Sequence, residues 1–503
     1  MRNNRTAIAG LLTLSLALAV PHVPAQAASA DQPARLSGAD PFADCTADDT
    51  PGETYTPGTE SEPTIAVHPK NPRVMAVAWR QDLWATGSSR GIVVASTKNG
   101  GATWSTRVLP GVSACSGGEG RVTNPWIHFA ADGTLHASVT VFGGDRTIIA
   151  AGRSADGGLT WSAPIELAGD PMPRFFADKQ TITSDPRAPR RLYMVWNRRD
   201  REQDVHDLMF AQSGDGGRTW SPARSIYRPA TQGAGTIGSQ LAVLPDGGLA
   251  VVFVENDHPI GGAPWPPDIP EQVRAIRSDD RGATWSDPVT IAGYTAAQPL
   301  LPDTPWVPLI APGTVADIAV DQRSGGLYAV WADATLSTSL SAIALSYSAD
   351  GGRTWSAPRK INLTPDSPAF GAGQAFLPQV EVAGDGTVGV SYHDFRGNAA
   401  DPEATTDIWL ATCKGKRCSA PGAAWRERHL AGPFDINRAP HWFGGPYVGS
   451  YIPLAHTRSG FTLAPVMTSA DAGDATDVYF VSSSLERVTS AAAETSPADI
   501  TTR

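Results

Sequence analysis

One eight-residue pattern occurs five times in this chain and constrains its fold more than any other feature of the sequence. Each copy follows the order Ser/Thr-x-Asp/Asn-Gly-Gly-x-Thr-Trp, except that Arg281 replaces the first glycine in the fourth copy. The copies occupy residues 97–104, 154–161, 213–220, 278–285 and 348–355. Their final tryptophans are 57, 59, 65 and 70 residues apart. Five copies in one order predict an architecture built from repeated units.

The residues of this repeat pattern are those that a tight turn needs. The carboxylate or amide at the third position can accept hydrogen bonds from the backbone N–H groups that follow it, and the glycine pair tolerates positive φ. The threonine returns the chain to an extended strand, and the tryptophan supplies a large apolar group for packing against a neighbouring unit. We therefore interpret the repeat pattern as a structural turn between antiparallel strands.

Short apolar strands surround each copy and predict four strands per unit. The expected second strands of the units lie at residues 76–79, 135–141, 192–196, 249–254, 327–331, 388–392 and 461–467. The sixth unit carries Cys413–Cys418 and Trp425 in place of the pattern, and the seventh has neither. The sequence predicts an all-β, seven-bladed β-propeller with four antiparallel strands per blade, and a six-bladed propeller is the alternative.

The five copies resemble the Asp boxes, or BNR repeats, of the sialidase (neuraminidase) superfamily of β-propellers. The resemblance rests on five places between residues 97 and 355, and the strand pattern extends it to residues 60–485. It implies that functional residues gather around the central channel, on the face opposite the repeated turns. True sialidases have an early Arg-Ile-Pro motif, three separated arginines, an aspartate acid/base, and a tyrosine nucleophile paired with glutamate. This chain has Glu62-Pro63-Thr64-Ile65 where Arg-Ile-Pro would stand.

The ends of the chain differ from the repeated region. Residues 1–27 combine Arg2 and Arg5, an apolar run and an A-x-A site, which is typical of a secretory signal peptide and predicts a secreted protein. We expect an N-terminal extension at residues 28–58, the propeller domain at 59–485, and a disordered tail at 486–503.

Four cysteines in an exported chain are expected to form disulfides, and three pairings are possible. We favour pairing Cys413 with Cys418 across a local loop and Cys45 with Cys115. The formal net charge of −10, without a basic run interleaved with aromatic residues, argues against a nucleic-acid partner. We expect no cofactor, no metal ion and no membrane insertion.

Charged residues cluster where the second strands end and the first strands begin, which is where the resemblance places a site. Guanidinium groups can grip the carboxylate of an acidic sugar, and carboxyl groups can act as acid or base. The same residue types also occur in solvated loops and in ion pairs between blades. As substrate-binding residues we predict Arg80, Arg198, Arg396, His393 and Asp394, and as catalytic residues Tyr447 as nucleophile, Glu255 as its partner, and Asp82 or Asp178 as acid/base.

These residues favour a secreted, exo-acting, sialidase-like glycoside hydrolase that acts on extracellular glycans and releases a terminal, acidic sugar. One alternative is a lyase acting on uronate-containing polysaccharides, in which Arg396 or Arg198 neutralises the uronate and Tyr447, Tyr392 or His393 exchanges protons. The other alternative is a propeller that binds glycan or protein without catalysis, because a fold by itself does not define a function.

Overall fold

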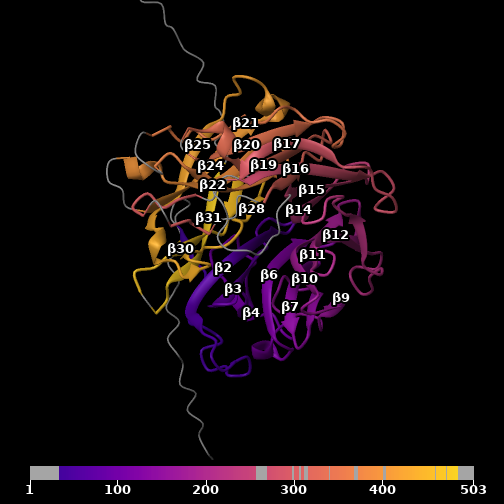
Figure 1. Cartoon of the computed structure of the whole chain (residues 1–503), viewed down its shortest axis with the longest axis vertical. Helices are drawn as coiled ribbons and strands as arrows, with labels where there is room; N and C mark the ends of the chain where they lie inside the picture. Colours follow the sequence, from indigo (N-terminus) through magenta and orange to yellow (C-terminus); the bar gives the residue numbers. More distant parts are fainter. Residues whose placement is uncertain are drawn as a thin grey trace, which may run out of the picture.

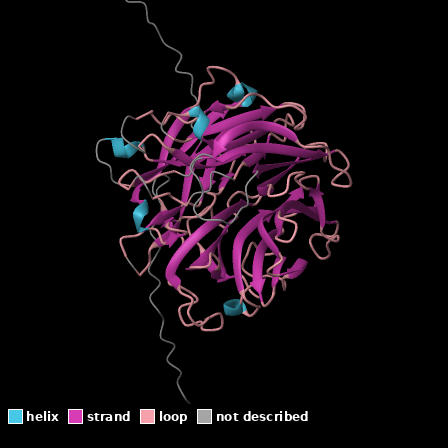
Figure 2. Ribbon diagram, viewed as in Figure 1, coloured by secondary structure: helices cyan, strands magenta, loops and turns pink. Residues whose placement is uncertain are grey.

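The computed structural model describes residues 33–484, apart from residues 257–268, 297–298, 305–306, 311–314, 339, 368–371, 400–403, 459 and 472. The predicted signal peptide and tail lie outside the described residues. Within these residues the protein is all-β, with five short 3-10 helices and no α-helix (Figure 2). No helix in this part of the chain is long and apolar enough to cross a membrane.

The strands form four-stranded antiparallel units that follow one another along the chain (Figure 1). Unit 1 contains β2 (Tyr55–Val67), β3 (Met75–Trp84), β4 (Ser89–Thr97) and β5 (Ser105–Val108), and unit 2 contains β6 (Arg121–Phe129), β7 (Leu135–Gly143), β8 (Arg146–Ser154) and β9 (Ile165–Pro171). Unit 3 contains β10 (Phe175–Asp185), β11 (Ala188–Asp200), β12 (Val205–Ser213) and β13 (Arg224–Tyr227), and unit 4 contains β14 (Gly235–Val243), β15 (Leu249–Asn256), β16 (Ile269–Ser278) and β17 (Val289–Ala296).

The second half of the chain continues this order. Unit 5 contains β18 (Asp317–Val320), β19 (Leu327–Asp333), β20 (Ala342–Ser348) and β21 (Arg359–Lys360), and unit 6 contains β22 (Ala375–Val382), β23 (Thr387–Asp394), β24 (Thr405–Lys414) and β25 (Arg426–Asp435). A small hairpin of β26 (His441–Trp442) and β27 (Gly445–Pro446) follows unit 6. The 3-10 helices are η1 (Ala114–Ser116), η2 (Ala334–Leu336), η3 (Arg396–Ala399), η4 (Gly415–Ser419) and η5 (Ile436–Arg438).

Unit 7 joins the two ends of the described chain. It contains β28 (Leu454–His456), β29 (Gly460–Leu463), β30 (Val466–Thr468) and β31 (Thr476–Ser484), and both β29 and β30 pair with β31. The outer neighbour of β31 is β1 (Ala34–Arg35) from the N-terminal extension. The sequence did not predict this strand, because its pairing partner lies more than 400 residues away.

The first strands of the units contact one another in the cyclic order β2, β6, β10, β14, β18, β22, β28 and back to β2. Apolar side chains fill the space between consecutive units, as in the cluster that joins Val94 and Leu109 of unit 1 to Leu135 and Val139 of unit 2. Further clusters of this kind join units 2 and 3, 3 and 4, 4 and 5, and 5 and 6, and one large cluster joins units 6, 7 and 1. Each unit therefore depends on its neighbours for burial of its sheet faces.

The repeat pattern forms the predicted turn. In the fifth copy Asp350 Oδ1 accepts hydrogen bonds from the backbone N–H groups of Arg353 (3.0 Å) and Thr354 (2.9 Å). Gly351 and Gly352 have φ values of 71° and 90°, which a residue with a Cβ adopts only with strain. The turn joins the third and fourth strands, as predicted. In unit 6 the segment between Cys413 and Cys418 takes this place, and the Trp425 indole donates to the Cys418 carbonyl at 3.1 Å.

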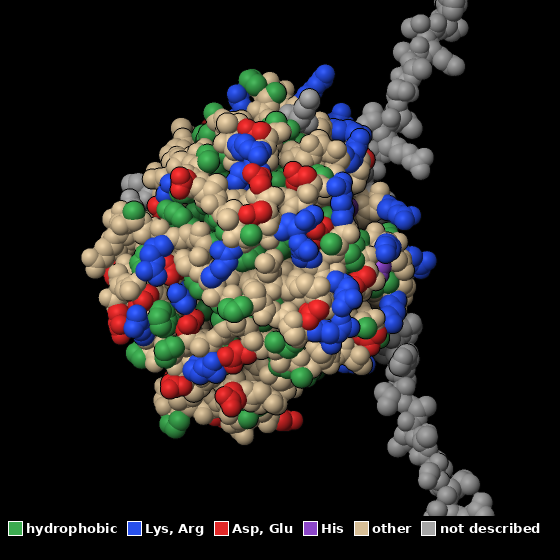
Figure 3. Space-filling model, turned by 90° about the vertical axis from the view of Figure 1, so that its right-hand side faces the viewer, with side chains coloured by type: hydrophobic (Ala, Val, Ile, Leu, Met, Phe, Trp, Pro, Cys, Tyr) green, Lys and Arg blue, Asp and Glu red, His purple; other side chains and the backbone are tan. Residues whose placement is uncertain are grey.

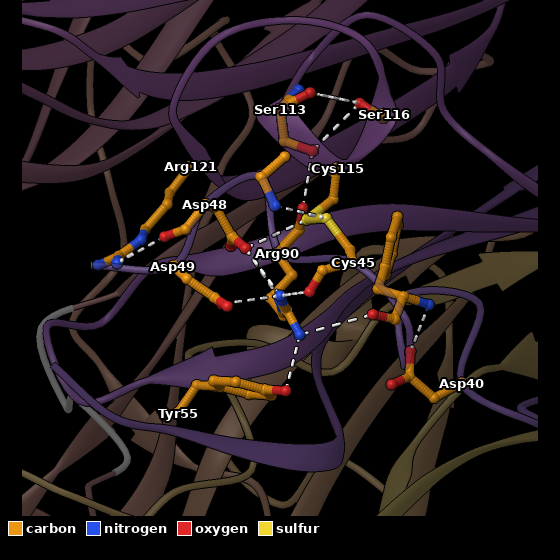
Figure 4. The surroundings of a disulfide bond; sticks show 12 residues. Asp40, Cys45, Asp48, Asp49, Tyr55, Arg90, Ser113, Cys115, Ser116 and Arg121 are labelled. Atoms are coloured by element: carbon orange, nitrogen blue, oxygen red, sulfur yellow. Dashed lines mark hydrogen bonds and ion pairs between the residues drawn. A yellow bond between two sulfur atoms is a disulfide. The ribbon is translucent and has the colours of Figure 1, made fainter. Parts of the chain in front are cut away.

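The N-terminal extension is tied to unit 1 by the Cys45–Cys115 disulfide and by Arg90 (Figure 4). The Arg90 guanidinium, which is only 1% exposed, donates to Asp48 Oδ1 at 2.9 Å and to the Tyr55 hydroxyl at 2.7 Å. Both disulfides pair as the sequence analysis favoured. The extension thus contacts unit 1 through a covalent bond and unit 7 through β1.

The two disulfides are expected to differ in their effect on stability. The loop closed by Cys45–Cys115 spans 70 residues and that closed by Cys413–Cys418 spans 5. Loop-closure entropy predicts a loss of about 4 kcal/mol for the double variant Cys45→Ser/Cys115→Ser, and about 2 kcal/mol for Cys413→Ser/Cys418→Ser. Denaturant unfolding of both variants and the wild type tests this order, and an equal or reversed effect would contradict it.

Candidate functional site

Five first strands share a β-bulge at the same place, and the bulge residue has positive φ. The residues are Glu62 (49°), Asn124 (51°), Lys179 (52°), Gly238 (64°) and Leu377 (52°), in units 1, 2, 3, 4 and 6. Left-handed backbone is costly for residues other than glycine, so it persists only where the surroundings enforce it. Bulges redirect side chains and are common beside functional sites. The five bulges thus place one residue of each of these units at an equivalent position.

Three of the bulge residues meet in one buried polar cluster. Lys179 Nζ lies 2.7 Å from Glu62 Oε1 and 3.1 Å from Asn124 Oδ1. Asn124 Nδ2 in turn donates to Asp178 Oδ1 at 2.6 Å. The bulges of units 4 and 6 carry a glycine and a leucine and add no polar group. The cluster therefore belongs to units 1 to 3.

Tyr447, from the segment between units 6 and 7, completes the cluster. Its hydroxyl donates to Glu62 Oε1 at 2.8 Å, and Ser450 Oγ donates to the same oxygen at 3.0 Å. Arg80 NH1 lies 3.2 Å from Glu62 Oε2 and 3.4 Å from the Tyr447 oxygen. Glu62 and Tyr447 are 0% exposed, whereas the Lys179 side chain is 13% exposed and Asp178 is half-buried. The opening to solvent is thus on the side of Asp178 and Lys179.

The charges in this cluster balance. Burial alone would disfavour the carboxylate of Glu62, but Lys179 and Arg80 outweigh it and hold the pKa of Glu62 well below its usual value. Burial and the negative charge of Glu62 raise the pKa of the Tyr447 hydroxyl. Lys179 stays protonated, because Glu62 and Asp178 raise its pKa against the effect of burial. The resting site contains an ionised carboxylate and a neutral phenol.

The β26–β27 hairpin covers Tyr447. The indole of Trp442 meets the Tyr447 ring edge-on at 4.8 Å, and the next residue, Phe443, is 67% exposed. A side chain at Gly87 would collide with the Trp442 ring, and the Gly87 carbonyl accepts a hydrogen bond from Arg80 NH2 at 2.6 Å. Tyr447 is 0% exposed, so its oxygen is closed off from solvent in the described structure.

Of the residues predicted from sequence, Tyr447, Arg80 and Asp178 lie in this cluster. Glu255 does not provide the partner of Tyr447. Its carboxylate accepts from the Tyr227 hydroxyl and from Arg274 NH1, the latter at 2.8 Å, between units 3 and 4. The carboxylate paired with Tyr447 in the described residues is that of Glu62.

Arg198 and Arg396 lie in other units and already have carboxylate partners. Arg198 contacts Asp207 at 3.2 Å and Asp170 at 3.5 Å in unit 3 and its neighbour. Arg396 contacts Asp394 and, at 2.8 Å, Glu427 in unit 6. These two arginines therefore do not form a triad with Arg80 in the described structure.

The remaining predicted residues are buried away from the Glu62 cluster. The His393 ring stacks on Phe376 at 5.5 Å, and burial lowers its pKa to about 3. Burial raises the pKa of Asp394 to about 6 although Arg396 opposes the shift. Asp82 accepts from the Gly58 backbone N–H at 3.0 Å, and burial together with Asp40 raises its pKa to about 7.

The sequence analysis gave no role to Glu62, Asn124 or Lys179. A signal for Glu62 and Asn124 was present, because each precedes a proline at the same point of its unit, in Glu62-Pro63 and Asn124-Pro125. Proline cannot donate to the strand ladder and is confined to edges and bulges. No comparable signal marks Ser450.

A cavity of about 1990 Å³ lies away from the Glu62 cluster. It is lined by turns between first and second strands, such as those at His68, Pro186 and Gly384, on the face that also carries the repeated turns. A second, smaller cavity of about 140 Å³ lies between the first strands and is lined by residues that include Thr181, Gln240 and Asp317. Of these places in the described structure, the Glu62 cluster is the one that combines a tyrosine hydroxyl, a carboxylate and two cations.

Several other tyrosines also pair with glutamates, and they provide a useful contrast. The Tyr294 hydroxyl donates to Glu271 Oε2 at 2.6 Å in unit 4, where both residues are buried. There, burial raises the pKa of Glu271 to about 7, despite the hydrogen bond from Tyr294. Glu62 differs because two cations keep it ionised. Of these two buried pairs, only Tyr447–Glu62 therefore has a fully ionised carboxylate at pH 7.

No protein-family model and no curated protein matches this chain. Among solved structures it is similar to the Hadza microbial sialidase Hz136, with a TM-score of 0.46 and 15% identity over 82% of this chain and 73% of that chain. It is also similar to the α-L-arabinofuranosidase Arb93A from Fusarium graminearum, with a TM-score of 0.45 and 14% identity over 75% and 96% of the two chains. The NanB sialidase from Streptococcus pneumoniae has a TM-score of 0.42 and 9% identity, over 86% and 94%. All three are glycoside hydrolases.

The contrast between the two buried pairs predicts a pH dependence. Glu271 keeps its proton in the folded protein up to pH 7, whereas in the unfolded chain it ionises near its usual value of 4.5. Stability contributed by Glu271 therefore falls as the pH rises from 4.5 to 7, and no further above pH 7. Glu271→Gln should gain about 3 kcal/mol relative to wild type between pH 4.5 and pH 8.

Urea unfolding at several pH values measures this difference. Glu202→Gln, at a side chain that is 64% exposed, is the matched control and should show a far smaller change. A difference between wild type and Glu271→Gln that stays constant with pH would show that Glu271 ionises normally in the folded protein.

Proposed function

We propose that the seven four-stranded units are the blades of one β-propeller, and that the protein is a secreted glycoside hydrolase acting on extracellular glycans. The observation that carries the proposal is the Tyr447 hydroxyl 2.8 Å from the ionised Glu62, beside Arg80 and Lys179. A tyrosine with an adjacent base is an activated nucleophile, and tyrosine serves as a nucleophile in some glycosidases. Asp178, at the open side of the cluster, is the nearby carboxyl group suited to acid/base work.

In the proposed reaction the Tyr447 oxygen bonds to the anomeric carbon as the bond to the leaving oxygen breaks. Glu62 takes the phenolic proton, and Asp178, once it has taken up a proton from solvent, protonates the leaving oxygen. Water then attacks the anomeric carbon, gives a proton to Asp178 and frees the tyrosine, which regains its proton from Glu62. Two displacements at one carbon retain its configuration.

The charges of the site affect whether an acidic or a neutral sugar is the better substrate. Glu62 and Asp178 balance Arg80 and Lys179, and Arg80 donates to both Glu62 and the Gly87 carbonyl. A sugar carboxylate would have to draw Lys179 or Arg80 away from Glu62, and this would raise the pKa of Glu62 and make it a better base. An acidic sugar would therefore activate the site, and a neutral sugar would leave the charges as they are.

The first test is a product assay of the secreted protein on sialosides, neutral glycosides and uronate-containing polysaccharides, followed by mass spectrometry and ultraviolet absorbance. The hydrolase proposal expects a free sugar that carries the mass of one added water. An unsaturated uronate would identify a lyase. Binding of glycan without any product would identify a non-catalytic propeller.

The role of Tyr447 is tested by comparing Tyr447→Phe with Tyr294→Phe. Both changes remove a buried hydroxyl that donates to a glutamate, so Tyr294→Phe is the control for the loss of such a hydroxyl away from the cluster. Tyr447→Phe should lower kcat by at least about 10³-fold, because it removes the nucleophile, and Tyr294→Phe should leave kcat within a few-fold of wild type. Equal losses in the two folded variants would mean that Tyr447 is structural.

A further inference from the structure

A second acidic cluster lies where unit 7 meets unit 1, away from the Glu62 cluster. Glu60 on β2, Asp477 on β31 and Asp474 just before β31 each offer a carboxylate oxygen, and these oxygens lie within 4.8 Å of one another. Three oxygens no farther apart than this lie at most about 2.8 Å from a common point, near the Ca²⁺–oxygen distance of about 2.3–2.6 Å, so a small movement lets one ion contact all three. The strands that carry them belong to the first and last units of the chain.

Glu60 is the unusual member of this group. It is 0% exposed, and its Oε1 accepts a hydrogen bond from Gln81 at 2.9 Å. Its Oε2 is buried without any hydrogen-bond partner in the described structure. A buried carboxylate oxygen without a donor is costly, and metal coordination is one of the few ways to satisfy it.

The surrounding charges also favour a cation. Arg35 contacts Asp474 and, at 2.6 Å, Asp477, so one guanidinium faces three carboxyl groups. Asp82 lies on the other side of Gly58, where its Oδ1 accepts a hydrogen bond from the Gly58 backbone N–H at 3.0 Å. Asp82 Oδ2 is likewise buried without a hydrogen-bond partner.

We propose that Glu60, Asp474 and Asp477 bind one calcium ion at the seam between units 1 and 7. Oxygen ligands from carboxylates are those that Ca²⁺ prefers, and water completes its shell on the side where Asp474 is 27% exposed. The Arg35 side chain, 43% exposed, can swing into solvent when the ion takes its place. The ion links β2 to β31. The N-terminal extension also joins units 1 and 7, through the Cys45–Cys115 disulfide and β1.

Arg35 gives the proposal a distinctive signature. If a cation competes with this guanidinium, removal of the guanidinium strengthens calcium binding. If instead no ion binds and Arg35 alone neutralises these carboxylates, removal of its guanidinium only destabilises the contact between units 1 and 7. A purely structural acidic cluster does not predict tighter binding from an arginine deletion.

The experiment uses the full secreted protein, freed of metal with a chelator and titrated with CaCl₂. Calorimetry counts the ions bound, and thermal unfolding reports the rise in Tm that binding to the folded state produces. Wild type should bind one Ca²⁺ per chain, with Glu60→Gln binding at least about tenfold more weakly and Arg35→Gln several-fold more tightly. Glu202→Gln, an exposed acid in unit 3, should match wild type.

Asp474→Asn is the second variant, in case Glu60→Gln does not fold. Asp474 is partly exposed, and its substitution leaves the buried Glu60 in place. No saturable binding by wild type and by Arg35→Gln would overturn the proposal. Binding that Glu60→Gln and Asp474→Asn both leave unchanged would also overturn it, since the ion would then sit elsewhere. None of these results depends on whether the protein hydrolyses glycans.

Discussion

The carboxylate of Glu62 is fully buried, and the arrangement of the candidate site depends on keeping it ionised. An unpaired charge in such a place is very costly, so Arg80 and Lys179 must both stay within contact distance. That requirement explains why two bulges with left-handed backbone, at Glu62 and Lys179, are tolerated in neighbouring units. Both are needed to turn these side chains toward the same point, and Tyr447 then has a charged acceptor for its hydroxyl.

The units are held together by apolar packing between neighbours and by additional links at the seam between units 1 and 7. The clusters between consecutive units bury both faces of each sheet, and the first strands contact one another in a cycle. At the seam the chain adds β1, the Cys45–Cys115 disulfide and the Arg90 ion pairs. The concentration of such links at one junction is understandable, because no short connection in the sequence joins unit 7 to unit 1.

Much of the fold follows from local sequence. The repeat pattern predicted its turn because aspartate, two glycines and threonine determine the backbone there without help from distant residues. The alternation of short apolar strands likewise predicted four-stranded units. The strand β1 in unit 7 was not predictable, since two paired residues, Ala34 and Arg35, carry no pattern of their own.

The residues of the candidate site were predicted less completely, and the reason is geometric. Tyr447, Arg80 and Asp178 were selected from their positions at strand ends, and they do meet. The partner of Tyr447 was expected to be Glu255, but it is Glu62. The regular alternation of a strand does not predict a bulge, and the bulge changes the direction of the Glu62 side chain. Arg198 and Arg396 have suitable chemistry, but sequence could not show that Asp207 and Glu427 already neutralise them.

The most direct test of the account is to trap the covalent intermediate. The protein is treated with an activated fluoro-glycoside of the sugar that it releases, digested, and analysed by peptide mass spectrometry. The account predicts one glycosyl group on the peptide that contains Tyr447 and none after Tyr447→Phe. A label on another residue, or none in a protein that continues to turn over, would show that Tyr447 is not the nucleophile.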